Sequence, residues 1–147
     1  MPVRPIIPPA AVWLGSAGLL PFLAAAAVLV LQRPAPPAAL QALLAYGAAI
    51  LSFLGGIHWG LAVAMARPQR LWSRLGLSVV PALLAWVALL LPDAAGLLLL
   101  SAGLALTLVA DLRATSAGLA PNWYPRLRLP LSLGAMVALL VGAWVAA

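Results

Sequence analysis

The sequence predicts an all-α membrane protein, a bundle of five transmembrane helices that forms a single domain over residues 1–147. The composition is the first reason, because 66% of the residues are hydrophobic and 7% are charged. A soluble domain has about 25% charged residues, so this chain has too few polar groups to cover a globule in water. The composition therefore excludes a soluble domain and a disordered tail, and the absence of cysteine excludes a disulfide scaffold.

The second reason is the length of the apolar runs, since about 20 helical residues cross a bilayer core of about 30 Å. Prolines, arginines and other turn residues separate five such runs. The third run reaches this length because Arg74 can extend its side chain to the headgroups. The first run exceeds the apolar core of a signal peptide, so we expect it to be retained. The predicted spans are 10–31, 38–66, 71–91, 94–112 and 131–147.

The arginines predict the orientation of the bundle in the membrane. All 8 basic residues are arginine, and only Arg33 lies on the side opposite the N-terminus and the 67–74 and 113–130 loops. By the positive-inside rule the N-terminus is cytoplasmic and the C-terminus is outside. This distribution favours the lipid bilayer and its anionic headgroups as partners of the positive charge. We do not expect nucleic acid as a partner. The excess of Ala, Leu, Arg, Pro and Gly is typical of a GC-rich bacterium, so we expect the bacterial inner membrane.

A re-entrant hairpin is the alternative to full crossings by the third and fourth runs, which are separated only by Pro92 and Asp93. Such a hairpin has the same loops inside, so the arginines do not distinguish the two arrangements. It would place the carboxylate of Asp93 in hydrocarbon, which is costly. We therefore expect two full crossings.

A stripe of small residues runs along the second predicted span. Its members recur every four residues: Ala48, Ser52, Gly56, Gly60 and Ala64. Small residues allow a neighbouring helix to approach closely. That helix either belongs to this chain or is supplied by a membrane partner or a second copy. Gly55 and Trp59 lie in the same glycine-rich segment and are further candidates for binding a ligand or partner.

His58 is the only histidine, and it lies inside the second span, roughly 12 Å from the predicted inner boundary. An ionisable residue at that depth is a functional candidate. The structural alternative is a hydrogen bond from a neutral His58 to the carbonyl of Ala17 or Leu77. These carbonyls lose their helical partners because Pro21 and Pro81 have no N–H.

Asp111 is placed by the predicted boundaries at the inner end of the fourth span, two turns shallower than His58. We therefore do not expect a direct His58–Asp111 pair, and we expect Asp111 to form a local ion pair with Arg113. One histidine, 2 acidic residues and no cysteine are too few for a metal site. No serine lies in a nucleophile elbow or a phosphate-binding loop. The sequence thus predicts no enzyme, no metal and no cofactor; a haem would need a second axial ligand from a partner.

The predicted inner loop before the fifth span is rich in proline and aromatic residues. Trp123 and Tyr124 are typical of the headgroup region, and Arg126 and Arg128 can pair with lipid phosphates. The loop is expected to be an interfacial anchor. The alternative is a docking surface for an anionic headgroup, a polar ligand head or another subunit.

The chain resembles the transmembrane protein 69 family, also called domain of unknown function 3429. The resemblance begins with Tyr46-Gly47 and Phe53-Leu54-Gly55-Gly56-Ile57-His58-Trp59-Gly60. Later blocks that match are Pro81, Trp86, Asp111, Pro121, Trp123-Tyr124 and Leu127-Arg128. The resemblance covers most of the chain from about Val12 and implies a small multi-span membrane protein of bacteria and mitochondria. It implies no activity. It also implies that position 58 accepts other residues, arginine included, which favours a basic or hydrogen-bonding role there.

Three functions fit these residues. The first is an accessory or assembly factor of a membrane complex, which docks through the small-residue stripe and the inner loop. The second is a binding protein for a lipid or isoprenoid-type ligand, with His58 as the hydrogen-bonding group and Arg126 and Arg128 at the mouth of the site. The third is a small transporter or proton pathway, in which Pro21, Pro81 and His58 lie at similar depth; transporters usually show internal repeats, and this chain shows none.

Overall fold

The computed structural model describes residues 6–64 and 68–147, and all the regular structure in these residues is helical. The helices are α1 (Pro9–Leu31), α2 (Pro37–Ala64), α3 (Pro68–Ala88), α4 (Asp93–Ser116) and α5 (Tyr124–Ala146). All five are long and apolar enough to cross a bilayer. The predicted class, a bundle of five transmembrane helices, is confirmed.

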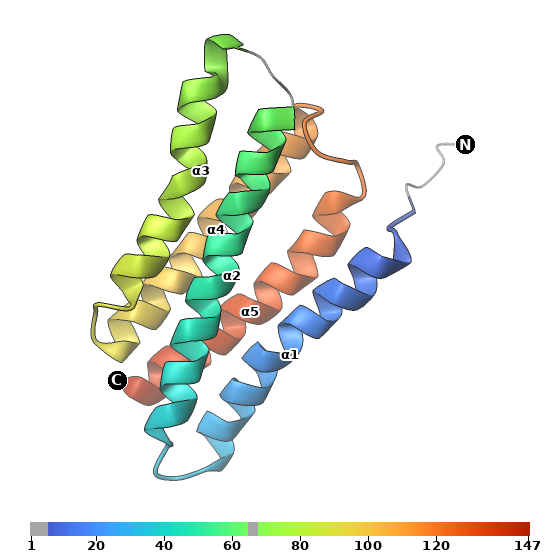
Figure 1. Ribbon diagram of the computed structural model, residues 1–147. Helices are drawn as coiled ribbons and strands as arrows, with labels where there is room; N and C mark the ends of the chain where they lie inside the picture. Colours follow the sequence, from blue (N-terminus) through green and yellow to red (C-terminus); the bar gives the residue numbers. More distant parts are fainter. Residues whose placement is uncertain (1–5, 65–67) are drawn as a thin grey trace.

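The five helices alternate in direction (Figure 1). The last turns of α2 and α4 and the first turns of α3 and α5 lie at one end of the bundle, whereas the α1–α2 and α3–α4 connections lie at the other. We call the first the arginine-rich end; its described arginines are Arg70, Arg74, Arg113, Arg126 and Arg128. That this end is cytoplasmic stays a prediction.

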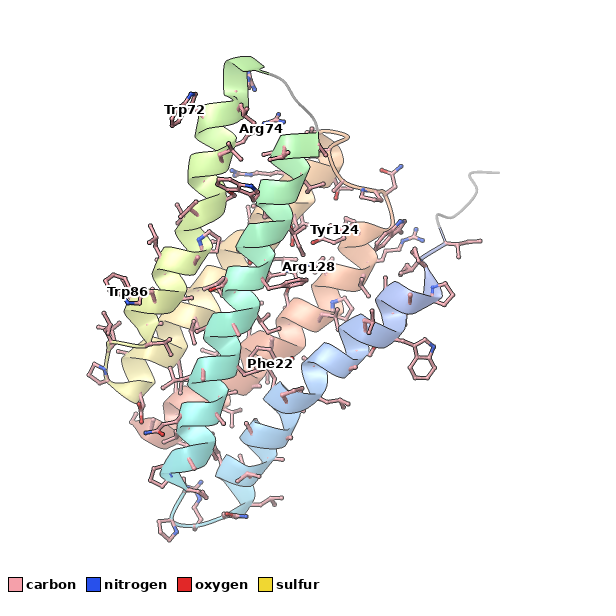
Figure 2. All side chains as sticks on the ribbon, in the orientation of Figure 1. Phe22, Trp72, Arg74, Trp86, Tyr124 and Arg128 are labelled. Atoms are coloured by element: carbon pink, nitrogen blue, oxygen red, sulfur yellow. The ribbon has the colours of Figure 1, made fainter. Side chains whose placement is uncertain are left out.

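Helix α2 is central, because it contacts each of the other four helices. Helix α1 packs on α2 and α5, and α3 packs on α2 and α4. Fully buried leucines from α2, α4 and α5 form the middle of the core, and Phe22 of α1 closes it (Figure 2). Two tryptophans of α3 instead project outward, Trp72 at 91% exposure and Trp86 at 60%. A membrane protein can expose such side chains because lipid surrounds it.

Helix α3 packs tightly against α2 at Gly55. A Cβ atom there would lie 2.6 Å from the carbonyl oxygen of Ser78 and 3.3 Å from Cβ of Pro81, so only glycine allows this crossing. By contrast, a Cβ at Gly56 or Gly60 would meet nothing within 4 Å. The glycine at which α2 packs against α3 is therefore Gly55, which is adjacent to the predicted stripe but not part of it.

The predicted stripe is covered within this chain only in part. Ala48 is buried, but Gly56, Gly60 and Ala64 are exposed. The reason is the helical repeat: four residues turn the helix by about 400°, so each step of the stripe drifts by about 40° around α2. Over the whole stripe the drift is about 160°, too much for one neighbouring helix.

Two helices extend well beyond the predicted spans, because α4 continues past Leu112 to Ser116 and α5 begins at Tyr124, before Leu131. Arg113 does not end α4, since an exposed arginine is compatible with the last turn of a helix. The helix ends at Ser116, and Gly118 follows it with a φ of +71°, which suits glycine; the Leu119 N–H then donates to the Ala114 carbonyl at 2.9 Å. Pro125 stands in the first turn of α5, where a missing N–H costs nothing.

Candidate functional site

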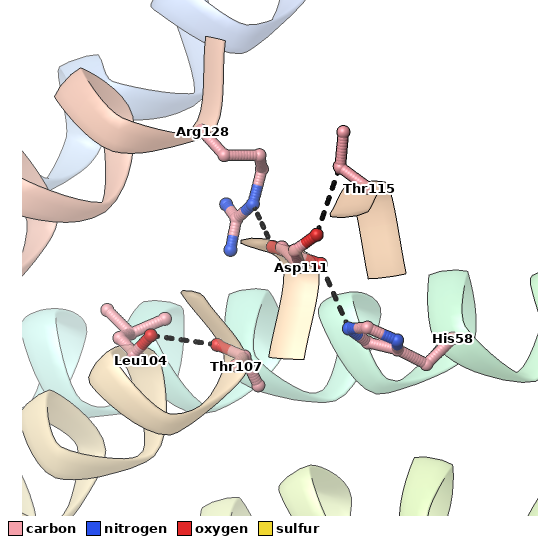
Figure 3. A network of polar contacts seen from close by, with 6 residues as sticks. All are labelled: His58, Leu104, Thr107, Asp111, Thr115 and Arg128. Atoms are coloured by element: carbon pink, nitrogen blue, oxygen red, sulfur yellow. Dashed lines mark hydrogen bonds and ion pairs between the residues drawn. The ribbon is translucent and has the colours of Figure 1, made fainter. Parts of the chain in front are cut away.

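Three helices bring a histidine, an aspartate and an arginine together near the arginine-rich end (Figure 3). Nε of Arg128 on α5 donates to Oδ2 of Asp111 on α4 at 2.6 Å. Nε2 of His58 on α2 lies 2.9 Å from Oδ1 of the same carboxylate. Asp111 is 2% exposed and Arg128 is 7% exposed. We call these three residues the ionic cluster.

The ionic cluster corrects two expectations about Asp111. The expectation that His58 and Asp111 would not pair was wrong, and so was the expected pair with Arg113, because the ionic partners of Asp111 are His58 and Arg128. The cause is the boundary of α4. With α4 ending at Ser116, Asp111 lies about 7.5 Å from that helix end, and His58 lies about 9 Å from the end of α2. The two side chains are therefore at the same depth.

His58 also does not bond to either carbonyl that the prolines were expected to free; the described polar contact of its ring is Asp111. The contact is close, although the ring N–H does not point along the line of a full hydrogen bond. The negative charge of the carboxylate beside Nε2 favours a proton over a lone pair on that nitrogen. The proton of a neutral His58 therefore belongs on Nε2, which leaves Nδ1 as a hydrogen-bond acceptor.

The helix α5 supplies a buried polar face that the sequence analysis missed. Tyr124, Arg128 and Ser132 are four residues apart and lie on one side of the helix. The hydroxyls of Tyr124 and Ser132 and Nη2 of Arg128 are buried without a partner among the described residues. Such atoms usually bind internal water. The four-residue spacing of these polar residues is a sequence signal for one helix face. It was missed because the predicted fifth span began after Arg128, so Tyr124 and Arg128 were assigned to a loop.

A cavity of about 490 Å³ lies between α2, α3 and α4, and His58 forms part of its wall. Most of its lining is apolar, for example Leu61, Leu77, Pro81, Leu84 and Leu106. Leu77 is 71% exposed and Leu106 is 63% exposed. The cavity thus opens sideways, toward the surface that would face lipid. We call it the α2–α3–α4 pocket.

The arginines at this pocket are Arg74 of α3 and Arg113 of α4, both of which line it. This corrects the expectation that Arg126 and Arg128 would stand at its mouth. Arg128 is buried behind Asp111, and Arg126 lines a smaller groove between α1 and α5. Figure 2 shows Arg74 at the arginine-rich end, with Arg128 deeper in the bundle. The last residues of the predicted loop, from Tyr124 to Arg128, belong to α5; its role as an interfacial anchor stays a prediction.

The remaining candidate residues lie apart from the ionic cluster or beside it. Trp59 is 46% exposed on α2. Trp123 precedes α5 and packs edge-on against Tyr124, with ring centroids 5.9 Å apart. Within the described residues no three His, Cys, Asp or Glu side chains gather into a metal ligand set. The chemistry available here is that of a hydrogen-bonding imidazole and two arginines, Arg74 and Arg113, in a mostly apolar pocket.

Together the fold and site define a small polytopic helical membrane protein with a buried ionic cluster beside an apolar pocket. The family model described as protein of unknown function (DUF3429) matches residues 7–144. The chain belongs to this family, which confirms the resemblance found in the sequence.

Two relatives are named Transmembrane protein 69. The chain is 41% identical to the one from Xenopus tropicalis over 137 residues, which cover 90% of this chain and 53% of the relative. It is 31% identical to the one from Mus musculus over 137 residues, which cover 91% of this chain and 55% of the relative. The chain thus spans about half the length of the curated relatives it matches. No solved structure matches it.

Proposed function

We propose that this protein binds a lipid or isoprenoid-type ligand in the α2–α3–α4 pocket, with His58 as the group that recognises a polar atom of the ligand. The proposal includes no catalytic step. The observation that carries it is an imidazole ring, in contact with a buried carboxylate, in the wall of a mostly apolar cavity of about 490 Å³. Small-molecule sites typically have volumes of 300–1,000 Å³ and combine apolar walls with a few oriented polar groups.

The ionic cluster supports this proposal because it orients the imidazole. Asp111 holds the Nε2 side of the ring, and Arg128 holds Asp111. The ring is 19% exposed, so part of it is accessible. Nδ1 is then the atom that meets the ligand, as an acceptor for a ligand hydroxyl or amine. A bulky apolar ligand enters from the side, where Leu77 and Leu106 are exposed.

The test compares lipids and isoprenoids that are retained after purification in a mild detergent. Ala110→Phe fills the pocket, since Ala110 lines it. Ala102→Phe is the matched control, because Ala102 is an exposed alanine of α4 that does not line the pocket. We expect a retained compound in the wild type and in Ala102→Phe, a loss in Ala110→Phe and a smaller loss in His58→Leu. Equal recovery from all four proteins would refute the proposal.

A second candidate function is that of an accessory or assembly factor, and the uncovered part of the stripe favours it. Gly56, Gly60 and Ala64 present a flat face of α2 on which another helix could pack. The test is gentle solubilisation from the native membrane followed by intact-complex mass analysis. A stoichiometric protein partner that is lost in Gly60→Leu supports this function; a chain that runs alone contradicts it.

The bacterial inner membrane, with the arginine-rich end in the cytoplasm, is part of the proposal. The chain contains no cysteine, so single cysteines can be introduced without a background. We expect a cysteine at Ser73 to react with a membrane-impermeant thiol reagent only after the cells are opened. A cysteine at Ala147 should react in spheroplasts, and the reverse pattern would show the opposite orientation.

A further inference from the structure

We infer that the ligand of the α2–α3–α4 pocket is an anionic amphiphile whose headgroup lies between Arg74 and Arg113. This inference rests on the proposed ligand-binding function and names the class of ligand. Both arginines line the pocket, one from α3 and the other from α4. A negatively charged headgroup at this position would contact both side chains.

The charge balance of the chain leaves these two arginines without an internal counter-ion. The sequence has 8 basic and 2 acidic residues, and the acidic residues are Asp93 and Asp111. Asp111 is taken by Arg128 and His58. Asp93 begins α4 at the opposite end of the bundle. Among the described residues no carboxylate pairs with Arg74 or Arg113, so both guanidinium groups are available to an external anion at the arginine-rich end of the pocket.

The depth of each lining residue in the pocket indicates which part of the ligand it would contact. Arg113 is two residues nearer to the end of α4 than Asp111, the residue that marks the level of His58. The lining of α4 then continues inward to Gly103, about 12 Å deeper than Asp111. From the arginine-rich end inward the pocket thus offers two cations, one hydrogen-bonding ring and a mostly apolar section bordered by Pro81 and Leu84. An amphiphile with a charged head, a polar linker and a hydrocarbon chain has the same order.

A guanidinium group binds phosphate or carboxylate through paired hydrogen bonds, and two such groups suit a phosphate with several oxygens. The same oxygens could come from a lipid headgroup or from free phosphate. The apolar section below the arginines favours the lipid, because burying a hydrocarbon chain there adds binding free energy that inorganic phosphate lacks.

The test measures binding of two defined lipids that share their acyl chains, phosphatidylglycerol and phosphatidylcholine, to the full chain in detergent by native mass spectrometry. Arg74→Gln and Arg113→Gln remove one charge each, and Arg74→Lys keeps the charge. Arg70→Gln is the matched control, because Arg70 is an exposed arginine one turn earlier on α3 and does not line the pocket. Inorganic phosphate is added as a competitor.

We expect wild type, Arg74→Lys and Arg70→Gln to prefer phosphatidylglycerol, and each pocket arginine variant to bind it about fivefold more weakly. An equal loss in Arg70→Gln would mean general attraction at the membrane surface and overturn the inference. Displacement of the lipid by inorganic phosphate would overturn the lipid as the source of the anion. Equal binding of both lipids, with loss only in Ala110→Phe, would overturn the anionic ligand but leave the proposed function standing. Binding that Ala110→Phe does not change would refute both.

Discussion

Replacing Asp111 by asparagine should destabilise the bundle far more than any other loss of a negative charge. The substitution keeps the size of the side chain but leaves the guanidinium of Arg128, whose side chain is 9% exposed, without its counter-ion. His58 cannot replace the lost counter-ion, because an imidazole side chain supplies no negative charge. Nη2 of Arg128 already lacks a partner among the described residues. Removing one member of a buried ion pair typically costs about 3–5 kcal/mol, and we expect a loss in this range.

The chain offers a matched control, since Asp93→Asn removes the other acidic residue. Asp93 is exposed in the first turn of α4, where a carboxylate typically contributes about 0.3–1 kcal/mol by interacting with the helix dipole. The free energy of unfolding can be measured by titration with a denaturing detergent, followed by tryptophan fluorescence. Arg128→Met should restore part of the stability that Asp111→Asn loses, because the unpaired charge is then removed. Equal losses in Asp111→Asn and Asp93→Asn would refute the reasoning.

Gly55→Leu should destabilise the bundle by about 2 kcal/mol or more, the order that overpacking costs, because a side chain at Gly55 meets the carbonyl of Ser78. Gly56→Leu is the control and should be close to neutral, since a Cβ there meets nothing within 4 Å. Similar midpoints for the two variants in the same detergent titration would contradict this prediction. The tautomer of His58 can be read directly, since the only histidine of the chain gives a single imidazole signal after ¹⁵N-histidine labelling. For the neutral ring we expect the proton on Nε2, facing Asp111, and a proton on Nδ1 would show that the carboxylate does not set the tautomer.

Part of the candidate site could be predicted from the sequence, and part could not. His58, Asp111 and Arg128 were each recognisable as unusual residues of an apolar chain. Their meeting was not predictable, because it depends on where α4 ends and α5 begins. An error of a few residues at Leu112 and Leu131 placed Asp111 at the membrane boundary and Arg128 in a loop.

The pocket, too, could be predicted from the sequence only in part. Composition identifies Arg74 and Arg113 as boundary arginines, like Arg70 and Arg126, and nothing in the sequence separates them. Their common cavity is formed by α2, α3 and α4 together, so it is a property of helix packing. The spacing of small residues pointed to Gly56, whereas the close contact with α3 is at Gly55.

The sequence by itself determined the membrane environment, the number of helices and the end of the bundle that carries the arginines. These properties follow from hydrophobicity and charge summed over about 20 residues, and such sums tolerate errors of a few positions. Only the tertiary structure decided which charges pair, because an ion pair forms between atoms about 3 Å apart on helices that are distant in sequence. For Asp111, one turn of helix is the difference between a surface charge and the centre of a buried site.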